Sequence, residues 1–143
     1  MNEKIVLVTG VFDVLHEEHL NFLHKAKKLG TALLVGIESD VRVKLLKGEG
    51  RPINSERVRR THLKELAIAD EVFILPEKFS SIEDHRALLA KIKPAVLAVS
   101  SHTPFIENKR KLMAEVGGTV EIVHKQNKKI STTLILQRVS NKK

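Results

Sequence analysis

Short apolar runs alternate with longer amphipathic segments along nearly the whole chain, and this alternation limits the fold more than any other feature. The runs are nearly continuous in valine, isoleucine and leucine, which is typical of strands buried on both faces of a parallel sheet. They predict strands at residues 4–10, 32–39, 71–75, 95–100 and 119–125. Helices are expected in the intervening and final segments, at residues 18–29, 55–67, 81–92, 105–116 and 131–139.

This order of elements predicts a doubly wound α/β fold. Right-handed crossovers place the helices of repeated β-α-β units on both faces of one parallel sheet. A chain of 143 residues is long enough for one packed core and too short for two ordinary domains. We therefore expect a single domain over residues 1–143, with a five-stranded Rossmann-like sheet. The irregular stretch 47–56 predicts a mobile loop, and the basic end at 140–143 predicts a disordered tail.

Local signals refine the expected helix boundaries. Gly30 follows the apolar stripe of the first helix and supplies its stop. Ser55 is a suitable N-cap for the helix at 55–67. The buried side chains of that helix are expected to be Leu63, Leu66 and Ala67.

Composition limits the compartment and the class of partner. The chain has no cysteine, which excludes disulfides and thiolate metal sites and favours the cytoplasm. No apolar run approaches the roughly 20 residues of a membrane span, and the N-terminal residues lack a signal-peptide pattern. A net charge of +8 favours an anionic partner, either nucleic acid or small phosphates. Aromatic residues make up only 3% of the chain, so base-stacking surfaces are scarce and RNA binding is disfavoured.

The stretch VTGVFDVLHEEHLNFL, residues 8–23, carries the strongest functional signal. It joins the first predicted strand to the first predicted helix, and ligands of open parallel sheets bind outside the carboxyl ends of the strands. A helix start also attracts phosphate through its free N–H groups and its dipole. His16 and His19 can face one cleft there, as N–H donors that become cationic when protonated.

Two other interpretations of the histidine pair were weighed. The first is that His16 and His19 are ordinary polar residues of a loop. The second is a metal site, but the zinc-protease helix H-E-x-x-H needs its histidines four residues apart, and here they are three apart. The spacing therefore argues against a metal held by protein ligands.

TGVFDVLHEEHLNFL resembles the [ST]-G-x-F-D-x-x-H-x-G-H signature of the cytidylyltransferase-like nucleotidyltransferases. The matching positions are Thr9, Gly10, Phe12, Asp13, His16 and His19. ISTTLI, residues 130–135, is similar to the I-S-T-T-x-I motif that starts the last helix of this family. The resemblance covers nearly the whole chain and implies a Rossmann-like fold of the nucleotidyltransferase type.

The middle of the chain indicates which members of the family the sequence resembles most. VKLLKGEGRPINSERVRR, residues 43–60, looks like the family's lysine-bearing loop and the arginine helix that follows it. Its L-K-G-x-G-R-P-[IV]-N pattern is most similar to the heptose-1-phosphate adenylyltransferases of lipopolysaccharide precursor synthesis. Glycerol-3-phosphate cytidylyltransferases and archaeal FAD synthases, which adenylylate FMN, are the alternatives. The substrates implied are ATP or CTP and a phosphorylated small-molecule acceptor.

The resemblance implies a role for each matching residue. His16 and His19 would contact the α and β phosphates. Lys44 and Lys47 lie in the matching loop, and at least one of them would contact the transferring phosphate. Phe12 is expected to pack in the core. Asp13 is expected to brace its loop by hydrogen bonds. The full nucleotide-binding set is Thr9, Gly10, Val11, Phe12, His16, His19, Arg59, Ser100, Ile130, Ser131, Thr132 and Thr133. Mg²⁺ would arrive on the triphosphate, because it relies on substrate oxygens more than on protein ligands.

The sequence departs from the family pattern at two places. Glu18 stands where the family has glycine before its second histidine, and we expect its side chain to turn toward solvent or a neighbouring lysine or arginine. After the fourth strand, relatives read like V-K-G-G-D or M-G-D-D, whereas this chain reads VSSHTPF at 99–105. Ser100 can still donate a hydrogen bond there, but recognition of the acceptor must differ.

The leading hypothesis is therefore a nucleotidyltransferase that transfers a nucleoside monophosphate, most simply AMP from ATP, to a sugar phosphate and releases pyrophosphate. The second hypothesis is a catalytically impaired nucleotide-binding protein of the same fold, motivated by Glu18 and by the missing Gly-Asp pair after the fourth strand. A basic RNA-binding module is the third. The sequence also leaves a homodimer open.

Overall fold

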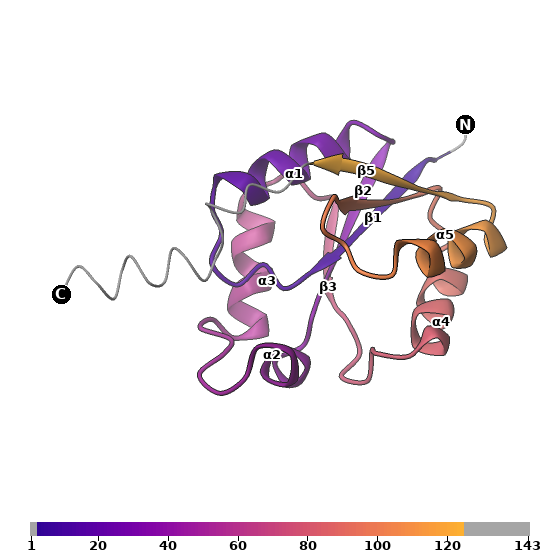
Figure 1. Cartoon of the computed structure of the whole chain (residues 1–143). Helices are drawn as coiled ribbons and strands as arrows, with labels where there is room; N and C mark the ends of the chain where they lie inside the picture. Colours follow the sequence, from indigo (N-terminus) through magenta and orange to yellow (C-terminus); the bar gives the residue numbers. More distant parts are fainter. Residues whose placement is uncertain (1–2, 125–143) are drawn as a thin grey trace.

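Five parallel strands form the centre of the protein, in the order β3-β2-β1-β4-β5 (Figure 1). The structure is a computed structural model, and it describes residues 3–124. The strands are β1 (Ile5–Gly10), β2 (Ala32–Ile37), β3 (Glu71–Ile74), β4 (Val96–Ser100) and β5 (Thr119–His124). The doubly wound parallel sheet predicted from the sequence is confirmed.

Helices cover both faces of this sheet (Figure 1). They are α1 (Glu17–Lys27), α2 (Asp40–Lys47), α3 (Glu56–Glu65), α4 (Ile82–Ile92) and α5 (Ile106–Glu115). The first face packs against α1 and α3, and the second packs against α4 and α5. The chain runs outward from β1 to β2 and β3, then returns to place β4 on the other side of β1. Strand order therefore reverses between β1 and β4, which is where open α/β sheets bind ligands.

The central strand β1 buries both of its faces, as its continuous apolar sequence predicts. In β1, Val6 and Val8 belong to one core cluster and Leu7 to the other, and all are fully buried. Leu23 of α1 and Leu63 of α3 complete the first cluster. Each fully buried side chain of this size contributes about 1.5–3 kcal/mol relative to an exposed one. The site is therefore held at the edge of a rigid, two-sided core.

The start of α3 agrees with the predicted N-cap, whereas the ends of α1 and α3 differ from the prediction. Ser55 is the N-cap of α3, and its hydroxyl accepts the N–H of Val58. Gly30 does not stop α1 through a left-handed cap; a Cβ atom there would lie 2.3 Å from the carbonyl oxygen of Lys4, so glycine is required by close packing. Ala67 lies beyond the end of α3 at φ 55° and is exposed, so the expected burial of this residue was wrong.

The helix α2 was not predicted, and it changes the setting of one candidate residue. Lys44 was placed in a loop, but it lies inside α2, and Lys47 is the last residue of that helix. Only Val43 of α2 is buried. The helix therefore lacks the apolar stripe from which an amphipathic helix is predicted in a sequence. The predicted helix at 131–139 and the predicted tail at 140–143 lie outside the described residues.

Candidate active site

A cavity of about 900 Å³ opens at the carboxyl end of the sheet. Its walls come from the ends of β1 and β4, the start of α1, the segment between β2 and α2, the start of α4 and the face of α5. This is the position that strand order predicts for a ligand site, and the volume lies within the range of small-molecule pockets.

The β1–α1 connection shapes the floor of this cavity. Phe12 adopts a left-handed conformation, φ 50°, and is only 6% exposed. Its ring lies 5.3 Å from the ring of His19 and would clash with any Cβ at Gly10, which would approach it to 2.8 Å. The expected core position of Phe12 is confirmed. A strained aromatic residue and a glycine thus fit together to turn the chain at the end of β1.

His16 and His19 stack on each other at the start of α1, with ring centroids 4.0 Å apart. His16 is the N-cap of the helix, and its Nδ1 accepts the N–H of Glu18 at 3.2 Å. The Nδ1 of His19 accepts the N–H of His16 at 3.4 Å. An acceptor nitrogen carries no hydrogen, so each neutral ring is protonated at Nε2. Both residues line the cavity, and the two Nε2–H groups are the donors that remain for a ligand.

Burial keeps these rings neutral. Desolvation, followed by the neighbouring His16, lowers the pKa of His19 to about 4, against the opposing charge of Glu18. Desolvation also lowers the pKa of His16, again against Glu18. At neutral pH the pair therefore offers N–H donors in their neutral form, and the cationic form expected on protonation needs a lower pH.

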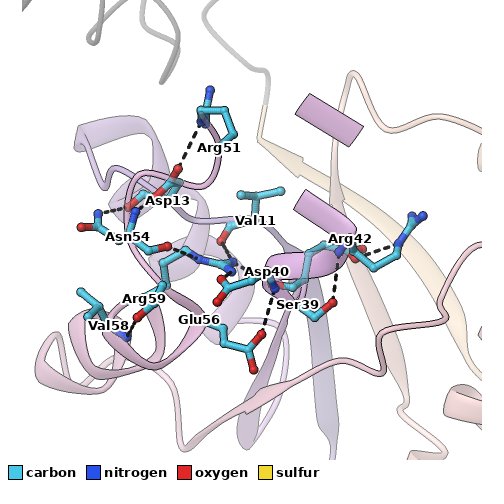
Figure 2. A network of polar contacts seen from close by, with 12 residues as sticks. Val11, Asp13, Ser39, Asp40, Arg42, Arg51, Asn54, Glu56, Val58 and Arg59 are labelled. Carbon is cyan, nitrogen blue, oxygen red and sulfur yellow. Dashed lines mark hydrogen bonds and ion pairs between the residues drawn. The ribbon is translucent and has the colours of Figure 1, made fainter. Parts of the chain in front are cut away.

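Asp13 braces the loop, as expected, and ties it to a distant segment (Figure 2). Its buried carboxylate accepts the N–H of Ile53 at 2.7 Å and the N–H of Asn54 at 2.8 Å. The Nε of Arg51 approaches it at 3.3 Å, and the side chain of Asn54 donates to the carbonyl of Asp13 at 2.8 Å. With its oxygens so occupied, Asp13 fixes the loop 48–55 against the histidine loop.

Arg59 also holds the loop 48–55 and the histidine loop in place (Figure 2). The side chain is fully buried and donates to the carbonyls of Asn54, Val11 and Glu38 at 2.7–3.0 Å, and it pairs with Asp40 at 2.8 Å. It does not belong to the cavity wall formed by the described residues. Its role as a nucleotide-binding residue, implied by the resemblance, stays a prediction, and the contacts seen here are structural.

Glu18 lies at the cavity rather than fully in solvent. The residue is half-buried and belongs to the cavity wall. Its carboxylate is close enough to oppose the lowering of the pKa that burial causes in both His16 and His19. A negative charge therefore stands beside the two donors, at the position where the family signature has glycine.

The remaining predicted residues divide into three groups. Thr9, Gly10, Val11, Lys47 and Ser100 line the cavity together with the histidines. Lys44 does not line it, and its Nζ lies 3.6 Å from the carboxylate of Glu49, at a side-chain exposure of 60%. Ile130, Ser131, Thr132 and Thr133 lie outside the described residues.

The sequence reading missed a second group of polar residues in the cavity. Arg42, His85, Thr103 and Lys109 line it from α2, α4, the loop after β4 and α5. The departure from the family pattern after β4 was the signal in the sequence, because it marked that loop as a place of altered recognition. No spacing in the sequence connects these residues, because they come together only through tertiary packing.

The family profile described as cytidylyltransferase-like matches residues 7–138. The chain belongs to the cytidylyltransferase-like family. Similar curated proteins include the bifunctional protein HldE of Campylobacter jejuni, 35% identical over 99% of this chain and 29% of the relative, and that of Pelobacter propionicus, 39% identical over 96% and 27%. The chain spans less than a third of the length of these relatives.

Solved structures agree with this family and fold. A lipopolysaccharide core biosynthesis protein from Thermoplasma volcanium superposes with a TM-score of 0.68 at 27% identity, covering 88% of this chain and 98% of that one. A pantoate-beta-alanine ligase from Francisella tularensis, complexed with beta-gamma ATP and beta-alanine, shares the fold with a TM-score of 0.65 at 16% identity, covering 98% of this chain and 69% of that one. The family profile confirms the predicted membership in the cytidylyltransferase-like family, and the solved structures confirm the fold.

Residues 3–124 contain neither a cluster of metal ligands nor a helix that could span a membrane. No group of three or more histidine, cysteine, aspartate or glutamate side chains in this range is arranged to hold a metal ion. None of its helices is long and apolar enough to cross a membrane.

Proposed function

We propose that this chain transfers the adenylyl group of ATP to the phosphate of a phosphorylated sugar. A phosphate oxygen of the acceptor attacks the α phosphorus of ATP, the bond from that phosphorus to the bridging oxygen breaks, and pyrophosphate leaves with the electron pair. The acceptor phosphate is already a nucleophile at neutral pH. The protein therefore needs to align the two substrates and to stabilise charge on the phosphoryl oxygens.

The observation that carries the proposal is the stacked pair His16 and His19. Their Nδ1 atoms are held by backbone N–H groups, which leaves two Nε2–H donors at a helix start in the cavity. Such donors bind phosphoryl oxygens without carrying a proton into the reaction, and each one is commonly worth ~10²–10³ in rate. Lys47 lines the same cavity and supplies a full positive charge.

The choice of substrates rests on likeness and size. The L-K-G-x-G-R-P-[IV]-N pattern in residues 43–60 favours a sugar phosphate and ATP over CTP or FMN. The relatives named HldE and the lipopolysaccharide core biosynthesis protein support the same class of acceptor. A cavity of about 900 Å³ has room for a nucleotide with a small acceptor. A nucleoside triphosphate substrate also agrees with the cytoplasmic location expected from the sequence.

A magnesium ion on the triphosphate fits the residues of the site. Asp13, Glu18 and Glu38 are the carboxylates in the cavity wall, and Asp13 is already saturated by backbone and arginine donors. Mg²⁺ keeps water and substrate oxygens as most of its ligands, so a site poor in available carboxylates suits an ion that arrives with the nucleotide. When bound, it would supply positive charge beside the phosphoryl oxygens.

Pyrophosphate release tests the proposal. The protein is incubated with ATP or CTP, Mg²⁺ and a panel of sugar 1-phosphates, and His16→Ala and His19→Ala are assayed in parallel. We expect release that needs both ATP and an acceptor, and that falls by ~10²-fold or more in each variant. Nucleotide binding without release for any acceptor would favour the impaired binding protein, for which the carboxylate of Glu18 in the cavity wall is the physical reason.

A further inference from the structure

Three basic side chains meet in the cavity away from the histidine pair. Arg42 comes from α2, His85 from α4 and Lys109 from α5, and each lines the cavity. The three elements follow β2, β3 and β4, whereas the histidine pair follows β1. We call Arg42, His85 and Lys109 the basic cluster.

The charges of the basic cluster act on one another and not on the histidine pair. Burial, then Lys109, lowers the pKa of His85, with Arg42 adding to the effect and Asp84 opposing it. The charges that act on His19 are instead His16 and Glu18. The cavity therefore contains two polar regions, each with its own neighbouring charges.

Arg42 and Lys109 of the basic cluster have N–H groups that no acceptor within residues 3–124 satisfies. Arg42 is only 15% exposed at its side chain, and its Nε lies 3.4 Å from the carboxylate of Glu38. Its terminal guanidinium nitrogens make no hydrogen bond within residues 3–124. Lys109 donates to the hydroxyl of Thr103, and no carboxylate of the described range lies within ion-pair distance of it.

Leaving these charges unneutralised is costly. Burial lowers the pKa of Lys109, which means that its ammonium group has lost hydration without gaining a counterion. Glu38 offsets only one positive charge, and the carboxylate of Asp84 is engaged by the backbone of Ser80 and Ser81 at the start of α4. The loop after β4 adds no negative charge, because its residues 100–105 are SSHTPF where relatives carry aspartate. An anionic ligand would restore the balance.

The histidine pair fixes where the reacting phosphates must lie. The α phosphate of the nucleotide and the acceptor phosphate that attacks it belong beside His16 and His19 if the proposed function holds. A second anion-binding region on other elements can then serve either the outer phosphates of the nucleotide or a second anionic group of the acceptor. Saturation with a nucleotide analogue separates these two, because the outer phosphates are then already bound. The ring of Phe79 is tilted against that of His85, with centroids 4.1 Å apart, and both residues line the cavity. An apolar wall therefore adjoins the cluster, as suits the carbon skeleton of a sugar.

We propose that the acceptor carries a second anionic group, distant from the reacting phosphate, and that Arg42, His85 and Lys109 bind it. The substrate class is then a sugar bisphosphate or a phosphorylated sugar acid. This inference rests on the proposed function, because it takes the histidine pair as the site of the reacting phosphate. Arg42 and Lys109 become the residues that decide acceptor specificity.

Calorimetry on the protein saturated with α,β-methylene-ATP and Mg²⁺ tests this assignment. The titrants are the 1-phosphates and the 1,6-bisphosphates of glucose and mannose. We expect at least one bisphosphate to bind about tenfold or more tightly than its monophosphate. Lys109→Gln and Arg42→Gln should each reduce that ratio to about twofold while leaving monophosphate affinity unchanged, and Lys109→Arg should restore most of it.

Lys111→Gln is the matched control, since Lys111 is exposed on the same helix and does not line the cavity. It removes the same charge and should keep the ratio of the wild-type protein. If no bisphosphate binds better than its monophosphate, the inference is overturned. It is also overturned if the variants weaken both titrants equally, because the cluster would then hold the reacting phosphate. Failure of the nucleotide analogue to bind would instead contradict the proposed function.

Discussion

The low pKa of His19 comes from its place between Phe12 and a second imidazole. The side chain is held in a site where a charged ring would lose its hydration and meet no nearby counterion except Glu18. The unfolded chain takes up a proton near pH 6.5, whereas the folded protein resists protonation of His19 down to about pH 4. Stability is therefore fully present above pH 6.5 and is lost as the pH falls through this window.

His19→Asn should weaken this pH dependence. Asparagine keeps an acceptor oxygen for the N–H of His16 and does not titrate. From pH 7 to pH 4.5 the wild-type protein should lose up to about 3 kcal/mol more unfolding free energy than the variant, measured by urea denaturation at each pH. His62→Asn, on the exposed face of α3, controls for the loss of an imidazole. Parallel curves for the wild-type protein and His19→Asn would show that burial does not govern this titration.

Glu18 offers a second test at the scale of one residue. Its half-buried carboxylate lines the cavity beside the two histidine donors, so it should repel the phosphates of a nucleotide. Solvent access screens this repulsion, so Glu18→Gln should tighten binding of ATP with Mg²⁺ by less than about tenfold, which is ~1.4 kcal/mol. The gain, measured by calorimetry, should shrink between low and physiological salt. A gain of a hundredfold, in affinity or in turnover, would show that the native chain is an impaired binder.

Some residues of the site could be predicted from the sequence, and others could not. The roles of Phe12 and Asp13 were predictable, because both belong to one contiguous motif whose residue types suit a tight, braced loop. Arg42 and Lys109 were not recognised, because their burial depends on helices that pack together from distant parts of the chain. Arg59 was recognised as special, but its complete burial and its carbonyl partners could not be read from the chain.

At the scale of elements, strands were easier to predict than short helices. The strands are predicted by their runs of valine, isoleucine and leucine, which can be recognised without knowing which segments pack beside them. The helix α2 has eight residues, and Leu45 and Leu46 in it are exposed, so its sequence shows no clear apolar face. Residues of α3 hold the first residue of α2 in place. The N–H of Asp40 donates to Glu56 at 2.9 Å, and the carboxylate of Asp40 pairs with Arg59. Such contacts are tertiary.

The end of α3 gives a prediction about an element. Ala67 follows the helix in a left-handed conformation, φ 55°, and is exposed, so glycine at this position would relieve backbone strain without losing buried surface. Ala67→Gly should raise the free energy of unfolding by about 0.5–1 kcal/mol in urea denaturation. Ala87→Gly, at an exposed position inside α4, should lower it by about 1 kcal/mol. Destabilisation by Ala67→Gly would contradict the left-handed assignment.

At the scale of the whole molecule, Asp13 and Arg59 connect the site to the fold. Asp13 binds the backbone of Ile53 and Asn54, and Arg59 joins the carbonyls of Val11, Glu38 and Asn54 (Figure 2). The ends of β1 and β2 and the start of α3 are thus joined through one buried guanidinium group. The geometry of the histidine loop should therefore depend on the same contacts that stabilise the sheet.

Replacement of Arg59 separates this structural role from the nucleotide contact that the resemblance implies. Arg59→Met keeps much of the side-chain volume but leaves three carbonyls without their donor and Asp40 without its partner, so we expect a loss of about 3–5 kcal/mol in unfolding free energy. Arg57→Met, exposed on the same helix, should change it by less than about 0.5 kcal/mol. The increase in melting temperature on adding ATP and Mg²⁺ reports binding to the folded state, and we expect a folded fraction of Arg59→Met to retain most of it. Near-normal stability with complete loss of that increase would instead favour a direct contact between Arg59 and the nucleotide, because the contacts of Arg59 within the fold would then have contributed little to stability.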